Sequence, residues 1–137
     1  MANKESMSDG PKFNAEKHIA RLREGAEQVL SDALYLAKDK RIFLSLFAAH
    51  LAVEKAIKAH VVKDINDIPP FIHNLPKLAE LARIELTEKQ RNFLADLTFY
   101  NISGRYQESV GAPPPLSEVK SIIRQAKEMT EWLLKTL

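Results

Sequence analysis

Three ionisable side chains stand on one face of a long apolar segment. Between Arg41 and Val62, His50, Glu54 and Lys58 follow one another at intervals of four residues. In a helix this spacing puts side chains on one face, and large hydrophobic residues share the sector of His50 and Glu54, with Lys58 at its edge. Burying a charge without a partner is costly or shifts its pKa. We therefore expect these groups to be paired, inside the protein or with a ligand.

A second segment offers a counterpart to this face. The stripe of Leu94 and Leu97 continues one turn at a time into Asn101 and Arg105. The guanidinium of an arginine has five donors in a rigid fork, which suits a carboxylate such as that of Glu54 or a phosphate. Two interpretations follow: a buried Glu54–Arg105 ion pair that fixes helix register, or a polar pocket that binds a ligand.

Metal binding and histidine catalysis are the less favoured chemistries. His50 and Glu54 could be two metal ligands, but a third, for instance His73, would have to come from another segment. We expect no metal and no cofactor. His73 follows two prolines and is interpreted as an anchor for a short helix. His18 and His60 are expected in solvent, and the aromatic residues Tyr106 and Trp132 in the core or an interface.

Apolar residues recur at three- and four-residue spacing in the segments that must position these groups. The pattern predicts an all-α fold, an antiparallel up-and-down bundle of four long helices and one short one. The expected helices are Asn14 to Lys38, Asp39 to Lys63, Asn74 to about Arg83, Thr87 to about Glu108, and a last one from Ser117. Asn14 and Ser117 are predicted N-caps, and Thr87 with Gln90 fits a capping box.

Length and composition favour one domain of an intracellular protein. The 137 residues suffice for one core, with residues 1–13 as a disordered lead and 14–137 as the domain. The net charge of +2 gives no strong attraction to nucleic acid as a whole. The sequence has no cysteine and its N-terminus is polar, which suits the cytoplasm. Charges interrupt the apolar run 42–62, so we expect no membrane span.

The sequence resembles the HEPN domain, a small helical bundle named for nucleotide binding in higher eukaryotes and prokaryotes. The run Ala48–Ala59 resembles its helix signature, Ile72-His73-Asn74-Leu75 its entry to a short helix, and Tyr100–Tyr106 its Tyr-x4-Arg-Tyr segment. This resemblance implies a bundle that is often a homodimer and commonly accompanies a minimal nucleotidyltransferase on a separate chain, as a binding subunit or a toxin partner.

Many HEPN proteins are metal-independent RNases that use an Arg, four to six residues and a His. After Arg105 this window holds Val110, Gly111 and Ala112, so the expected acid/base group is missing. The leading hypothesis is therefore a non-catalytic subunit of a toxin–antitoxin-like module that binds a nucleotide or RNA phosphate and pairs with a nucleotidyltransferase. The expected ligand-binding residues are Arg105, Asn101, Lys58, Glu54, His50, Tyr106 and His73. An RNase toxin and a structural dimerisation module are the alternatives.

Overall fold

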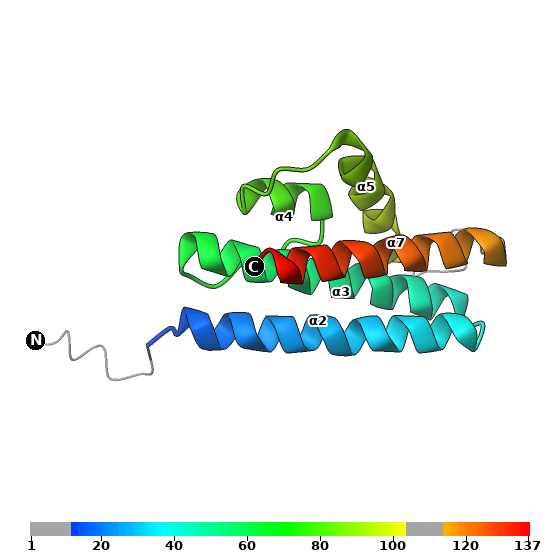
Figure 1. Cartoon of the computed structure of the whole chain (residues 1–137), viewed down its shortest axis with the longest axis horizontal. Coiled ribbons are helices and arrows are strands. Elements are labelled where there is room, and N and C mark those ends of the chain that lie inside the picture. The colour runs from blue at the N-terminus through cyan, green and yellow to red at the C-terminus, as the bar shows by residue number, and fades with distance from the viewer. Residues whose placement is uncertain (1–11, 104–113) are drawn as a thin grey trace, which may run out of the picture.

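The described chain is helical throughout, with short connections. A computed structural model describes residues 12–103 and 114–137, and within these ranges it has five helices and no strand. They are α2 (Ala15–Lys38), α3 (Ile42–Ile65), α4 (Leu75–Leu81), α5 (Glu88–Ser103) and α7 (Leu116–Lys135) (Figure 1). The predicted fold of four long helices and a short one is confirmed.

Helix α3 lies in the middle of the bundle and packs against each of the other four helices. Helix α2 runs antiparallel to it, α7 lies along it, and α5 is steeply inclined to both (Figure 1). The position of α3 follows from its composition, because apolar side chains on every side of a helix require neighbours on every side. The largest fully buried side chains of this core include Leu46, Ile57, Leu78, Leu94, Leu97 and Leu133.

The N-termini of α2, α5 and α7 were each predicted to have a side-chain cap. Asn14 accepts a hydrogen bond from the amide of Lys17, and Thr87 and Gln90 exchange the two bonds of a capping box, so both predictions are confirmed. Ser117 is not a cap. Helix α7 already begins at Leu116, with Pro115 at the N-cap position and no side-chain cap. The fixed backbone angle of proline sets this boundary earlier than the serine pattern predicted.

The other boundaries differ from the sequence pattern by a few residues. Helix α3 begins at Ile42, after Arg41, and extends past Lys63 to Ile65, where Asn66 ends it in the left-handed conformation with φ of 54°. Asparagine tolerates that conformation better than most residues. Helix α4 ends at Leu81, short of Arg83. The predicted continuation of α5 to Glu108 and the lead 1–11 lie outside the described residues.

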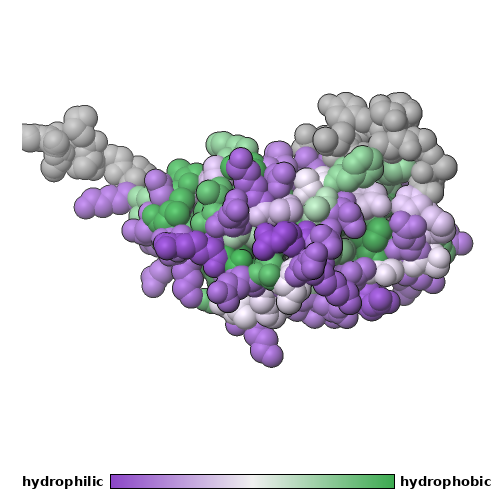
Figure 2. All heavy atoms as spheres, turned by 90° about the horizontal axis from the view of Figure 1, so that it is seen from above, coloured by the Kyte–Doolittle hydropathy of each residue, from purple (hydrophilic) through white to green (hydrophobic). Residues whose placement is uncertain are grey.

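The face seen in Figure 2 is mostly hydrophilic, with apolar side chains in separate patches. The loop between α3 and α4 carries two of the most exposed apolar residues, Ile68 and Phe71, which are 58% and 92% exposed. Of the described helices, none is long and apolar enough to cross a membrane. The loop with Ile68 and Phe71 leads directly to His73, so apolar surface lies next to the polar site.

Candidate functional site

A buried carboxylate on α3 organises the site. The side chain of Glu54 is only 4% exposed, and its two oxygens have different partners. Lys58 Nζ, one turn further along α3, donates to Oε2 at 2.8 Å. His73 Nδ1, from the loop before α4, lies 3.0 Å from Oε1. Because a carboxylate only accepts, Nδ1 of His73 carries the proton. One carboxylate therefore holds an ammonium group and an imidazole side by side.

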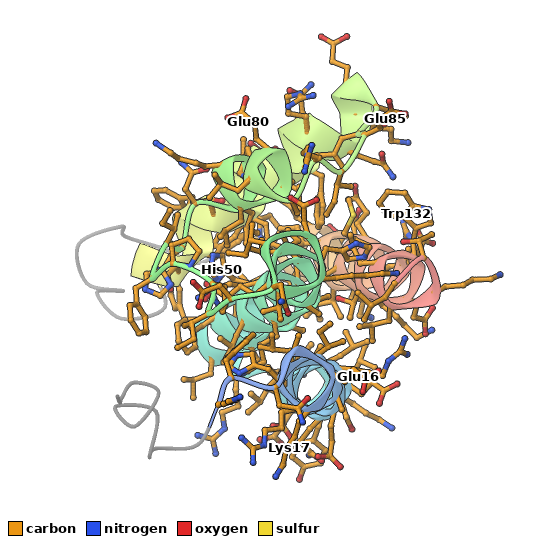
Figure 3. All side chains as sticks on the ribbon, turned by 90° about the vertical axis from the view of Figure 1, so that its left-hand side faces the viewer. Glu16, Lys17, His50, Glu80, Glu85 and Trp132 are labelled. Atoms are coloured by element: carbon orange, nitrogen blue, oxygen red, sulfur yellow. The ribbon has the colours of Figure 1, made fainter. Side chains whose placement is uncertain are left out.

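His50 is fully buried and holds the same loop by its backbone. Its Nε2 lies 3.0 Å from the carbonyl oxygen of His73 and must donate to it. The other nitrogen, Nδ1, lies 3.6 Å from Glu54 Oε1 and has no hydrogen-bond partner. This contact is an ion pair only when the ring is protonated. Figure 3 shows His50 on the side of α3 where the C-terminal part of α5 is seen.

Burial and hydrogen bonding set the charges of the two buried groups. Burial lowers the pKa of His50. The hydrogen bond to His73 and the charge of Glu54 raise this pKa by less, so the net shift is downward. Burial alone would raise the pKa of Glu54, but the hydrogen bonds from Lys58 and His73 lower it below its ordinary value. At neutral pH His50 is thus neutral and Glu54 is charged. The 3.6 Å contact is therefore not an ion pair at that pH.

The loop that presents His73 is fixed at the start of α4. Asn74 caps this helix by accepting from the amide of Lys77. The amide of Leu75 donates to Oγ1 of Thr98 on α5, at 3.0 Å, and the same hydroxyl donates to the carbonyl of Leu94. Sequence reasoning missed Thr98, because a threonine inside a helix gives no signal for a contact with a different helix. Residues on α3 and α5 thus hold the backbone on both sides of Asn74.

The structure brings together four of the seven predicted site residues, namely His50, Glu54, Lys58 and His73. Asn101 is buried near the end of α5, which packs on α3. Arg105 and Tyr106 lie outside the described residues. The predicted Glu54–Arg105 pair therefore stays a prediction. Glu54 nevertheless already has a cation, Lys58, as its partner.

The described residues offer no metal site, and the remaining histidines lie outside the Glu54 cluster. Among the described residues, no group of three His, Asp or Glu side chains is arranged to hold a metal ion. His60 is not solvated as predicted, because it is half-buried and its Nε2 donates to the carbonyl of Leu133 on α7 at 2.7 Å. The ring of His18 is partly exposed and lies against Phe13, with centroids 5.5 Å apart.

The HEPN domain model matches residues 19–137, which is most of the chain. The protein belongs to the HEPN domain family. The match includes α3 to α7 and all but the first turn of α2, so the buried polar cluster of this HEPN domain lies within the family region. No curated protein and no solved structure gives a significant match.

Proposed function

We propose that this HEPN domain is a non-catalytic subunit that binds the phosphate of a nucleotide or of RNA beside Glu54. The observation that carries the proposal is Lys58, a cation that is held on that carboxylate and is still partly open to solvent. The side chain of Lys58 is 13% exposed and that of His73 is 47% exposed. Each uses one N–H on Glu54, so the ammonium of Lys58 has further N–H groups for an anion. Arg105 and Asn101 are proposed to complete the phosphate site from the α5 side.

The charge balance of the cluster supports binding over an internal Glu54–Arg105 pair. Lys58 already neutralises the carboxylate at 2.8 Å, so Arg105 is not needed as its counter-ion. A guanidinium without an internal carboxylate is suited to bidentate recognition of phosphate. An arginine added to this cluster makes it net positive. A net positive, partly exposed cluster favours an anionic ligand.

Binding of ATP and of a short single-stranded RNA tests the ligand half of the proposal. Isothermal titration is run on the wild-type chain, Arg105→Ala and Lys58→Gln, with Lys77→Gln as control because Lys77 is an exposed lysine on α4. We expect saturable binding by the wild-type chain. The affinity should fall at least about tenfold in Arg105→Ala and in Lys58→Gln, because each variant loses a charge-assisted contact. Equal and negligible binding by all four proteins would remove the ligand half.

We further propose that the domain pairs with a separate minimal nucleotidyltransferase and forms a homodimer, in a cytoplasmic module of the toxin–antitoxin kind. The support is family membership together with the exposed Ile68 and Phe71 beside the site. Apolar side chains of this exposure favour protein contacts. Co-expression with a nucleotidyltransferase encoded next to this chain, followed by size-exclusion chromatography, tests the pairing. Separate elution at micromolar concentration contradicts it.

RNA cleavage is a second candidate function, favoured by the Glu54–His73 hydrogen bond. A carboxylate on Nδ1 orients the ring and leaves Nε2 as the basic nitrogen, and Nε2 of His73 has no partner among the described residues. Nε2 could take the proton of a ribose 2′-hydroxyl. The 2′-oxygen then bonds to phosphorus and the bond to the 5′-oxygen breaks, with a proton from water going to the leaving oxygen. No metal is required for this step.

The two functions differ in a direct assay. A cleaving enzyme shortens labelled RNA in the presence of a chelator, and His73→Ala abolishes this while RNA binding persists. A binding subunit retains RNA intact over the same time. Intact RNA bound to the wild-type chain excludes cleavage under these conditions and leaves the binding proposal in place.

A further inference from the structure

A groove lies between α5 and α7, and none of the described residues that line it belongs to the Glu54 cluster. Both helices pack on α3, and their backbones come close to each other at few points. Between them lie two adjoining hollows of about 240 and 540 Å³, and Lys89, Phe93 and Gln125 line both. In Figure 3, Trp132 rises from α7 toward the side where the segment of Glu85, just before α5, is seen.

The walls of the groove are apolar and only partly covered. Phe93 from α5 and Ile122, Met129 and Trp132 from α7 line it, and three of these four side chains are half-buried. Phe99, which also lines it, is 53% exposed and packs edge-on against Tyr100. Burying such surface against a partner is favourable, at about 25 cal/mol per Å² of apolar area. Aromatic anchors in a groove are typical of binding hot spots.

The rim of the groove is acidic. Asp96, Glu118 and Glu128 are exposed along it, and Lys89 is the one cation among the described lining residues. Tyr100 lies within the field of these charges. Burial raises its pKa most, and the carboxylates of Glu118 and Asp96 raise it further. This potential repels phosphates and attracts cationic side chains. The described part of the rim is therefore complementary to a basic partner rather than to a phosphate.

We propose that the α5–α7 groove binds an amphipathic helix of a partner protein, with an apolar ridge flanked by lysine or arginine. On α5 the lining residues extend from Lys89 to Tyr100, a rise of about 16 Å, which equals about three helical turns. Three turns present anchors at positions i, i+3, i+4 and i+7, the pattern by which a helix occupies a groove. This inference does not depend on phosphate binding at the Glu54 cluster.

The chain carries its own reporter for this site, because Trp132 is its only tryptophan and lines the groove. The probe is a synthetic 14-residue helix with leucine on one face and lysine elsewhere. Its counterpart has the same leucine face and glutamate in place of lysine. We expect the lysine peptide to shift the Trp132 emission to shorter wavelength in a saturable way, with weaker binding at 0.5 M than at 0.05 M salt. The glutamate peptide should bind at least tenfold more weakly.

Variants of the rim decide between this groove and the rest of the surface. The double variant Asp96→Asn/Glu128→Gln alters two exposed side chains, so folding is preserved, and it should weaken the lysine peptide about five- to tenfold. Glu80→Gln, an exposed acid on α4, is the matched control and should change nothing. Equal affinity for both peptides overturns the proposal. So does an effect of Glu80→Gln as large as that of the double variant. An emission shift that follows protein concentration without peptide also overturns it, because a second copy then occupies the groove.

Discussion

The imidazole of His50 holds the backbone of His73 rather than its side chain. Nε2 of His50 lies 3.0 Å from the carbonyl oxygen of His73, while the ring of His73 turns to Glu54. A fully buried histidine on the central helix therefore fixes the position of an exposed one. Mutation of His50 is expected to act on the site through this backbone contact.

Acid should destabilise the protein through His50. Its pKa is lowered in the folded state from an ordinary value of 6.5, so the unfolded chain binds the proton first. The contribution of His50 to the free energy of unfolding is then fully present above pH 6.5. It is lost as the pH falls from there toward the pKa of the folded state. Glu54 adds a loss of the same sign at lower pH, because its pKa is also lowered, from 4.5.

The measurement is urea unfolding of the wild-type chain and of His50→Gln between pH 8 and 5. Glutamine cannot be protonated but can still donate to the carbonyl of His73. Its stability should fall less steeply below pH 6.5 than that of the wild type. His18→Gln, at a partly exposed ring, is the control and should keep the wild-type slope. Identical slopes in all three proteins would contradict the assignment.

Glu54→Gln should cost about 1–3 kcal/mol of unfolding free energy, because Lys58 loses a charged partner in a site that is mostly closed to water. The double variant Glu54→Gln/Lys58→Met removes both charges and should lose less than the sum of the two single variants. Chemical denaturation of all four proteins gives the coupling free energy. Additive losses would show that the 2.8 Å contact contributes nothing to stability.

The periodicity of apolar residues was sufficient to predict the helices of this molecule. The spacing of polar residues was sufficient to predict much of the polar face of α3. Intervals of four residues place His50, Glu54 and Lys58 on one face of α3 whatever the remaining chain does. The contact of Glu54 with His73 is different, because it spans 19 residues and depends on where the loop before α4 is held. His60 shows the same limit, since its ring bonds to the carbonyl of Leu133 on α7, 73 residues away. Contacts between distant segments depend on packing geometry that no local pattern contains.

The two predicted serine and threonine caps should behave differently on mutation. Thr87→Ala removes the hydroxyl that accepts from the amide of Gln90, and should cost about 1 kcal/mol. Ser117→Ala should change stability by less than about 0.5 kcal/mol, because Ser117 lies inside α7 and is exposed. Thermal unfolding compares them directly. A loss at Ser117 as large as that at Thr87 would contradict this and show that Ser117 caps α7.

Thr98→Val should loosen the segment that carries His73. The substitution keeps the shape of the side chain but removes the hydroxyl that accepts from the amide of Leu75 at 3.0 Å. That amide belongs to the first residue of α4 and has no acceptor within the helix, so it is left without a partner, and the cost should be about 1–2 kcal/mol. Hydrogen exchange should show faster exchange at Leu75 and little change at Gln90, whose amide is bonded to Thr87. If Leu75 exchanges at the wild-type rate, Thr98 does not hold the loop, and His73 depends on Glu54 and His50 alone.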